Sequence, residues 1–463
     1  MQTIIGAQLE IEDPSRELME WVKKELILTN PEYVKKTRMG LWTGNTPPTI
    51  RLYAMKGTKL ILPFGVIRRA LPMLQSGELV SSFRDKKEID YKGATVQLYK
   101  YQTEALKNMI NNTYGILKSP AGSGKTQIGE AVAVELKCRT LWLTHTKDLL
   151  NQSKSRAEQY IDPKLLGTIT EGKVEIGEAI TFATIQTMCK LDLDMLRDEW
   201  DCIIVDECHR VAGSPTAVSQ FSKVLNALRA RHKYGLSATV HRADGLIKAT
   251  YALLGEVIYT VPDEAVKEMV MQVTVYPVET QISITRDCLN TDGTLNYAKM
   301  ITYLTKVPPR NRLIVEDLIM NKEHYNLILS ERVDHLKQLY SMLPEDVRLQ
   351  ASVIDGKMTS KAQKAEREQA IEDMRAGKKR YLFATYALAK EGLDVPRMDR
   401  LFLATPQKDY AVITQSIGRI ARKFDGKDDP VAYDYVDASA FHLKSYKTRC
   451  TTYRKCGCRF KEE

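Results

Sequence analysis

Short, almost entirely apolar runs alternate with amphipathic stretches between residues 114 and 440. Runs this short do not fill a helix and are typical of buried strands. We expect strands at 114–118, 140–144, 180–184, 202–206 and 233–237, with helices at 126–136 and 147–160 between them. Apolar strands that alternate with helices predict a parallel sheet covered on both faces, which is an α/β fold.

The same alternation begins again in the second half of the chain. We expect strands at 326–330, 380–384 and 400–404, and helices at 332–343 and 360–375. Each half has the size of an ordinary domain. We place the join near residues 261–267, just after a hairpin-like stretch at 255–261. The pattern therefore predicts two tandem parallel-sheet domains, at residues 91–265 and 266–440.

The two ends of the chain follow other patterns. Residues 1–90 contain TIIGAQLEI, TIRLYAM and TKLILPF, which resemble half-buried strands, and helical stretches at 15–26 and 65–74. These features predict a small α+β domain. Residues 441–463 are expected to form a separate basic tail that contains cysteines.

Composition fits a folded protein rather than a disordered or membrane-spanning one. Hydrophobic residues make up 43% of the 463 residues and charged residues 27%, which is ordinary for globular chains. No apolar run approaches the roughly 18 residues that would cross a bilayer. The start, MQTIIGAQLEIEDPS, has no basic segment followed by an apolar one, so we expect a cytoplasmic location.

Positive charge gathers at the ends of the chain. The formal net charge is +10; residues 1–100 carry 16 Lys/Arg against 11 Asp/Glu, and residues 441–463 carry seven against two. Basic ends around a nearly neutral middle suit contact with a phosphate backbone. A solvated basic surface explains the charge equally well, so the pattern alone leaves both interpretations open.

The segment SPAGSGKT, which ends at Thr126, has the composition of a phosphate-binding loop. It joins a predicted strand to a predicted helix, and Gly122 and Gly124 let backbone N–H groups turn toward a phosphate. Lys125 would contact the β- and γ-phosphates, and the Thr126 hydroxyl would bind Mg²⁺. Ser119 stands where the strict pattern has Gly. We expect the nucleotide to be held by Ser119, Gly122, Ser123, Gly124, Lys125 and Thr126.

A pair of acids follows the predicted strand at 202–206, within the sequence DECH. Asp206 would emerge at the end of that strand, where it can bind Mg²⁺ directly or through water. Glu207 can then orient and deprotonate the attacking water. DECH alone could be a polar cap on a core strand. Its place about 80 residues after the phosphate loop favours catalysis.

Small hydroxyls and paired arginines complete the candidate chemistry. LSAT places Ser237 and Thr239 after another strand, where they could bond to the acids, although alone it reads as a Ser/Thr turn. QSIGRIAR presents Gln415, Arg419 and Arg422 at helical spacing. Two guanidinium groups suit the charge that builds on a transferring phosphoryl group. Since the second half has no phosphate loop, hydrolysis would require both halves to close on ATP.

Together these motifs resemble superfamily 2 helicases of the DExH type, and the resemblance covers residues 97–440. In the family's order the motifs are LYKYQ (98–102), SPAGSGKT (119–126), LTHTKDLLNQ (143–152), TFATIQTM (181–188), DECH (206–209), LSATVHRADG (236–245), LILSERVDHLKQL (327–339), EGLDVP (391–396) and QSIGRIAR (415–422). The forms LSATxxRxDG and EGLDVP are similar to those of the group that contains XPB, RecG-type enzymes and the branch-migration helicase UvsW. Val240 and His145 stand where this group usually has Pro.

The resemblance implies two RecA-like lobes, ATP and Mg²⁺ as cofactors, and DNA as partner. It makes Gln102 and Asp394 nucleotide contacts and His209, Ser237 and Thr239 coupling residues. Thr144, Thr184 and Thr385 would contact the nucleic acid. We expect an ATP-dependent DNA helicase or translocase that remodels branched DNA. A duplex translocase with little unwinding, an RNA helicase, and a nucleic-acid-gated ATPase switch are the alternatives.

The ends of the chain leave two further questions. The first 90 residues interleave cations with Tyr33, Trp42, Tyr53 and Phe64, which could stack on bases or form the domain's own core. Cys450, Cys456 and Cys458 could bind zinc only with a fourth ligand, and His442 is distant in sequence. We expect a basic tail that touches DNA rather than a zinc site.

Overall fold

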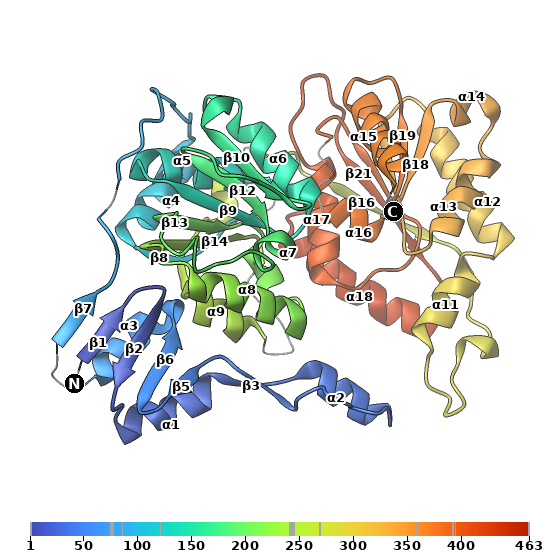
Figure 1. Cartoon of the computed structure of the whole chain (residues 1–463). Coiled ribbons are helices and arrows are strands. Elements are labelled where there is room, and N and C mark those ends of the chain that lie inside the picture. The colour runs from blue at the N-terminus through green and yellow to red at the C-terminus, as the bar shows by residue number, and fades with distance from the viewer. Residues whose placement is uncertain are drawn as a thin grey trace. The chain divides into compact units, whose positions relative to one another are not determined.

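The computed structural model describes residues 2–74, 78–85, 87–120, 122–239, 246–267, 270–356, 360–390, 393 and 395–461. The chain forms two compact units, residues 1–265 and 266–463. Each unit contains a parallel sheet, and the first unit also contains a small separate sheet near the N-terminus (Figure 1). The predicted fold class, two RecA-like domains preceded by a small α+β domain, is confirmed.

The small sheet has the strand order β5-β6-β2-β1-β7. Its strands are β1 (Gln2–Ile5), β2 (Gln8–Glu12), β5 (Ala54–Lys56), β6 (Lys59–Pro63) and β7 (Glu78–Ser81). Helix α1 (Arg16–Glu25) begins at Ser15, whose side chain accepts a hydrogen bond from the N–H of Leu18 at 3.2 Å. Leu18 and Val22 are the buried residues of α1 and pack into the core below the sheet.

This small domain shares its core with the first parallel sheet. Phe64 and Leu60 belong to the same apolar cluster as Tyr114, which begins a strand of that sheet. A Cβ on Gly65 would lie 2.3 Å from the backbone N of Gly255, so only glycine permits this approach. The small domain is therefore packed tightly against its neighbour.

An arm extends from the small domain between β3 (Ile27–Thr29) and β4 (Thr49–Arg51), which pair with each other in antiparallel fashion. The arm contains α2 (Pro31–Arg38), in which no residue is buried. Figure 1 shows α2 beyond the end of the small sheet. Asn30 fixes the base of the arm, since its side chain donates to the carbonyl of Pro47 at 2.8 Å.

The first parallel sheet has the strand order β11-β10-β12-β9-β13-β14-β8-β15. Its strands are β8 (Tyr114–Lys118), β9 (Thr140–Thr144), β10 (Leu166–Thr170), β11 (Lys173–Glu175), β12 (Ile180–Thr184), β13 (Cys202–Val205), β14 (His232–Ser237) and β15 (Val257–Thr260). Its helices are α4 (Lys100–Asn111), α5 (Lys125–Leu136), α6 (Lys147–Ala157), α7 (Ile185–Met188), α8 (Pro215–Ala227), α9 (Ile247–Leu254) and α10 (Asp263–Lys267).

One expectation about this sheet was wrong. The stretch at 255–261 is not a hairpin, because β15 pairs in parallel with β8 as the edge strand of the sheet. Gly255 has φ +92° and its Cβ position would meet the Tyr114 ring at 2.7 Å. The chain therefore turns there into an edge strand rather than back on itself.

The second sheet is wholly parallel in its described pairings and has the order β18-β19-β17-β20-β21-β16-β22. Its strands are β16 (Thr274–Glu279), β17 (Asn326–Ser330), β18 (Ala351–Ile354), β19 (Tyr381–Thr385), β20 (Arg400–Leu403), β21 (Val431–Val436) and β22 (Arg459–Phe460). Its helices are α11 (Tyr297–Leu304), α12 (Pro308–Met320), α13 (Val333–Met342), α14 (Glu345–Arg348), α15 (Lys361–Arg375), α16 (Tyr386–Lys390), α17 (Tyr410–Ile420) and α18 (Ala440–Lys455).

Residues 441–463 differ from the separate basic tail that the sequence predicts. Most of them form α18 and β22, and β22 pairs with β16 at the edge of the second sheet. Arg449 is buried and donates to both carboxylate oxygens of Asp434, at 2.7 and 2.9 Å. This buried ion pair removes Arg449 from any contact with DNA, and Cys450 is buried on the same helix.

No helix among the described residues is long and apolar enough to span a membrane.

Candidate nucleotide site

The phosphate-loop sequence lies between β8 and α5, at the carboxyl end of the first parallel sheet. Gly122 and Gly124 adopt φ values of +82° and +74°, which L-residues with a Cβ rarely adopt. Ser119 is fully buried, and its hydroxyl lies 2.5 Å from that of Ser123. Gly124 is the N-cap of α5, so the positive end of this helix begins where the loop ends.

Gln102 packs directly against this loop from α4. Its side chain donates to the carbonyl of Ser123 at 3.0 Å and accepts from the N–H of Tyr99 at 2.9 Å. A Cβ on Gly124 would lie 2.4 Å from the Gln102 amide nitrogen. Tyr101 also donates to the Ser123 carbonyl, at 3.0 Å. Sequence reasoning missed Tyr101, although it lies next to Gln102 in LYKYQ.

The lysine of the loop and the acids after β13 face the same space. The Lys125 ammonium lies 3.9 Å from a Glu207 carboxylate oxygen, and both side chains are largely buried. Glu207 has φ +47°, a left-handed conformation that is uncommon outside glycine. The backbone N–H of Glu207 donates to Asp206 at 2.9 Å. The fold thus gathers Lys125, Asp206 and Glu207 from two loops.

Asp206 is in an environment that disfavours its charge. Burial raises the pKa of Asp206 to about 6, and the neighbouring Glu207 carboxylate adds to this rise while Lys125 opposes it. A bound divalent cation would reverse the effect, because it stabilises the ionised form. Carboxylate and hydroxyl oxygens are also the ligands that Mg²⁺ prefers. Asp206 and Thr126 therefore fit a magnesium ion, and the loop fits a triphosphate.

The residues expected to couple hydrolysis to movement form one chain of contacts. His209 Nδ1 lies 3.2 Å from a Glu207 oxygen and 2.9 Å from the Ser237 hydroxyl. Ser237 donates to the carbonyl of Thr239 at 2.7 Å and accepts from its N–H. The N–H of Ser119 donates to the Ser237 carbonyl at 2.9 Å. The loops after β8, β13 and β14 are therefore directly connected.

Two further polar residues near Asp206 were missed in the sequence. Ser153 on α6 is buried, and its hydroxyl donates to Asp206 at 3.4 Å. Glu130 on α5 is fully buried, and burial raises its pKa to about 8. Both lie on helices whose sequences show only ordinary amphipathic spacing. No local signal identifies them, because their partner is distant in the chain.

In the second unit, α17 carries Arg419 but ends at Ile420, so Arg422 lies just past the helix and the expected helical pairing of the two arginines is not complete. Arg419 donates through Nε to the carbonyl of Ala389 on α16, at 3.0 Å. Gln415 lies one turn earlier, and its side-chain oxygen accepts no hydrogen bond from any described residue. The backbone of Arg422 forms a bridge to Val270. Asp394, predicted to contact the nucleotide, lies outside the described residues, as do Glu391 and Gly392.

The three predicted nucleic-acid contacts all end strands. Thr144 and Thr184 are directly paired at the carboxyl ends of β9 and β12. Thr144 is fully buried and donates to the carbonyl of Thr146 at 3.0 Å, whereas Thr184 donates to the Thr187 hydroxyl at 3.0 Å. Thr385 ends β19 and caps α16 by accepting from the N–H of Leu388 at 3.4 Å.

Two family models match the chain at the two parallel sheets. Residues 95–242 match the model described as type III restriction enzyme, res subunit, and residues 310–424 match the helicase conserved C-terminal domain. The solved structure of Saccharomyces cerevisiae Dbp5 bound to RNA and ADP BeF3 shares the fold, with a TM-score of 0.56 and 17% sequence identity. The match covers 79% of this chain and 89% of that chain. The fold is that of two tandem RecA-like domains.

Curated relatives agree with this class. A putative ATP-dependent RNA helicase of Acanthamoeba polyphaga mimivirus is 27% identical over 72% of this chain and 62% of its own length. The ATP-dependent DNA helicase uvsW of Enterobacteria phage T4 is 22% identical over 91% of this chain and 86% of its own. The chain is therefore similar to helicases of superfamily 2 in both of its parallel-sheet domains. It spans 62% and 64% of the first two relatives, the second being a putative helicase of Sulfolobus islandicus filamentous virus.

Proposed function

We propose that this chain is an ATP-driven DNA motor that remodels branched DNA, such as forks and four-way junctions, in replication, recombination or repair. The observation that carries the proposal is the connected set Lys125, Glu207, His209 and Ser237. These contacts join the phosphate loop to the end of β14, so they can pass the state of the nucleotide to the rest of the domain. A passive nucleotide-binding protein has no need of such a connection.

Hydrolysis would use residues from both units. Lys125 and the N-terminus of α5 would bind the phosphates, and Asp206 and Thr126 would hold Mg²⁺. Glu207 would take the proton from the attacking water. Arg419 and Arg422 would stabilise the charge on the transferring phosphoryl group, with Gln415 beside them and Asp394 contacting the nucleotide.

DNA is favoured over RNA by the extent of one relationship. The alignment with the phage T4 DNA helicase covers 91% of this chain. The alignment leaves out 9% of the chain, which is fewer residues than the small domain contains (residues 1–90). The alignment therefore includes part of the small domain. The mimivirus relative is named as an RNA helicase, and its alignment covers 72% of this chain. RNA is therefore the second candidate substrate.

The arm of the small domain would supply part of the DNA contact. Trp42 is 87% exposed there and Met39 is 60% exposed, which is unusual for such large apolar side chains. Lys35 and Arg38 are exposed on the adjacent α2. Phe64, by contrast, lies in the core. Aromatic rings flanked by cations suit bases that are unpaired at a branch point; Thr144, Thr184 and Thr385 would contact the strand that the motor follows.

Steady-state ATP hydrolysis tests the proposal, with a fork, a four-way junction, duplex DNA, single-stranded DNA and RNA of matched length. We expect the branched DNAs to stimulate most, and strand separation of the fork to require ATP. Strongest stimulation by RNA would overturn the DNA assignment. Hydrolysis without strand separation would leave two alternatives, a duplex translocase and a gated switch. A triplex-displacement assay distinguishes them, because a translocase displaces the third strand and a switch does not.

The arm is tested by the affinity of a fluorescein-labelled fork in anisotropy titrations. Loss of one stacked base costs about 1–3 kcal/mol, so we expect Trp42→Ala to weaken binding by about tenfold and Trp42→Phe to restore most of it. Met195→Ala is the matched control, since Met195 is 84% exposed on the first lobe. Equal affinity for all three variants would remove the arm from the DNA contact.

A further inference from the structure

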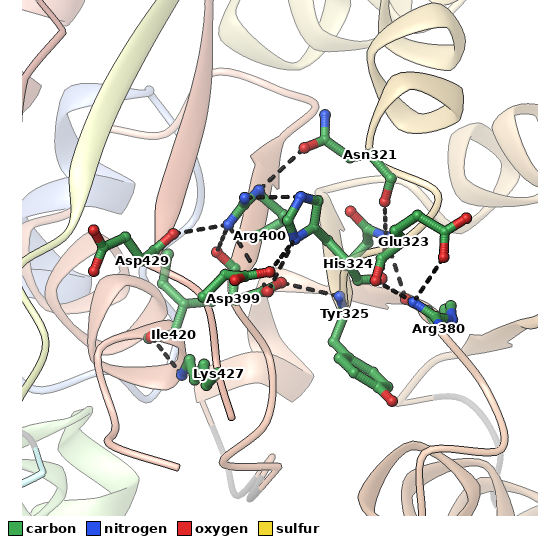
Figure 2. Close-up of polar contacts among 12 residues, drawn as sticks. Asn321, Glu323, His324, Tyr325, Arg380, Asp399, Arg400, Ile420, Lys427 and Asp429 are labelled. Carbon is green, nitrogen blue, oxygen red and sulfur yellow. Dashed lines mark hydrogen bonds and ion pairs between the residues drawn. The ribbon is translucent and has the colours of Figure 1, made fainter. Parts of the chain in front are cut away.

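Lys427 is held in an unusual way within the loop that joins α17 to β21. Its ammonium donates to three backbone carbonyls, those of Pro396 at 2.9 Å, Ile420 at 2.7 Å and Arg422 at 2.7 Å. Figure 2 shows the contact with Ile420. A lysine ammonium has three N–H groups. All three are therefore used to hold backbone, and the side chain is half-buried.

The three carbonyls belong to two separate motifs. Pro396 closes the EGLDVP segment, and Ile420 is the last residue of α17. Arg422 lies just past that helix end and is one of the two predicted phosphate-contacting arginines. Cations are favourable at a helix C-terminus, where carbonyls lack partners. Lys427 therefore satisfies the end of α17 and ties it to a segment distant in sequence.

The loop that carries Lys427 is itself fixed to the amino edge of the second sheet (Figure 2). Arg400 at the start of β20 donates to the carbonyl of Asp429 at 2.8 Å. His324 Nδ1 lies 3.1 Å from Asp399 and 3.3 Å from Asp428. Asp428 and Asp429 lie between Lys427 and Pro430 in the loop. Contacts with residues at the amino ends of the strands therefore fix the position of Lys427.

His324, Asp399 and Asp428 are near enough to one another to suggest a metal site. The contact of Arg400 with His324 argues against it. Arg400 Nη2 lies 3.0 Å from His324 Nε2, and a guanidinium can only donate. Nε2 is therefore the acceptor, and in neutral histidine Nδ1 then carries the proton. A protonated Nδ1 donates to the two carboxylates and has no lone pair for a metal.

We propose that Lys427 is a positioning residue for Arg422 during ATP hydrolysis. The inference rests on the proposed function, in which Arg422 meets the γ-phosphate. The backbone around Arg422 is also held by Met271, whose N–H donates to the Ala421 carbonyl at 2.7 Å. Lys427 adds a direct hydrogen bond to the Arg422 carbonyl, at 2.7 Å. A displacement of about 1 Å in a catalytic group costs roughly a hundredfold in rate.

The test compares Lys427→Met with Lys423→Met, an exposed lysine of the same loop. We expect Lys427→Met to lower kcat for nucleic-acid-stimulated ATP hydrolysis by about tenfold, with KM and the Kd of a fluorescent ATP analogue within about twofold. Lys423→Met should match the natural protein. Lys427→Arg keeps the charge but cannot reach three carbonyls in the same way, so its kcat should lie between those of the two Met variants. The same Arg variant tests the inference if Lys427→Met folds poorly.

A double-mutant cycle shows whether Lys427 acts through Arg422. In an Arg422→Ala background we expect Lys427→Met to cause no further loss of kcat. Additive losses would mean that Lys427 supports the fold generally, and this would overturn the inference, as would normal kcat in both Lys427 variants. If Arg422→Ala alone hydrolyses ATP at the natural rate, the phosphate-contacting role of Arg422 fails instead. The two failures are thus distinguishable.

Discussion

Each of the two parallel sheets carries a polar cluster at its strand ends, and these two clusters lie at opposite edges of their sheets. In the first unit Asp206, Glu207 and Ser237 lie at the carboxyl ends of the strands, with the phosphate loop. In the second unit Asp399 and Arg400 lie at the amino ends of the strands, next to the loop before β21. The same architecture therefore has a reactive edge in one domain and a polar structural edge in the other.

The contacts at the two edges differ as well. Lys125 and Glu207 are 3.9 Å apart, which is beyond hydrogen-bond length, and burial raises the pKa of Asp206 to about 6. Arg400 instead makes close contacts with the side chains of Asn321 and His324 and with two backbone carbonyls. Charged side chains without close hydrogen bonds to each other can bind a ligand, whereas a charged side chain with close hydrogen bonds stabilises the fold. The following predictions test this contrast.

The largest effect is expected at the reactive edge. Glu207→Gln keeps the shape of the side chain but removes its basicity, so it should lower kcat for ATP hydrolysis by about a thousandfold. Binding of a fluorescent ATP analogue should stay within about threefold of the natural protein. A turnover near the natural rate would show that another group takes the proton.

At the structural edge the effect should fall on stability. Arg400→Met removes one partner of a buried network and leaves Asp399 and His324 without it, so it should lower the free energy of unfolding by about 3 kcal/mol. Chemical denaturation measures this loss. At a temperature where the variant remains folded, kcat should be within about threefold of the natural value; a selective loss of kcat with full stability would contradict the structural role.

Ser237→Ala separates the coupling from hydrolysis itself. The variant removes the hydroxyl that contacts His209 at 2.9 Å but leaves Lys125 and the two acids in place. We expect basal ATP hydrolysis to change less than twofold and its stimulation by branched DNA to fall by about tenfold. Ser153→Ala is the matched control, because its hydroxyl lies 3.4 Å from Asp206 and does not contact His209. An equal loss in both variants would show a general disturbance of the site.

The smallest effect is a pH dependence of stability from Glu130. Burial raises the pKa of Glu130 from 4.5 to about 8, with Asp206 adding to the rise and Arg156 opposing it. The folded state thus binds this proton more tightly than the unfolded state. Its contribution to stability is complete below pH 4.5 and is lost as the pH rises through about 8.

Glutamine has no such proton to lose. The Tm of Glu130→Gln relative to the natural protein should therefore rise between pH 5 and pH 8.5, by about 2–4 °C, as measured by thermal melts in matched ionic strength. Glu135→Gln, in the same helix, is the control and should show no such trend. A constant Tm difference across this pH range would mean that Glu130 does not titrate there.

Much of the fold follows from local pattern. The apolar runs at 114–118, 140–144, 180–184 and 326–330 match β8, β9, β12 and β17 residue for residue. Such strands are apolar on both faces, which leaves a clear signal between polar loops. The boundaries of β16 and β21 gave no comparable signal, because Pro277 and Asp434 interrupt their apolar character.

Contacts between distant residues could not be predicted. Arg449 reads as a surface cation until Asp434 is seen beside it, and Lys427 reads as part of the charged stretch KFDGKDDP. The candidate site follows the opposite rule. Gly124, Lys125, Asp206 and Glu207 were predictable because phosphate chemistry demands those residue types at fixed places in a strand and loop. Their roles in catalysis remain predictions.

Lys233 connects the small domain to the first parallel sheet. Its buried ammonium donates to the Ala7 carbonyl of the small domain at 3.1 Å and to the Leu225 carbonyl at 2.6 Å, and it lies 4.7 Å from the centre of the Phe64 ring. A chain shortened to begin at residue 91 would expose that cation together with the apolar surface around Tyr114. The small domain is therefore part of the folding unit of the first sheet, and a replacement for it would have to supply a carbonyl and an aromatic ring to Lys233.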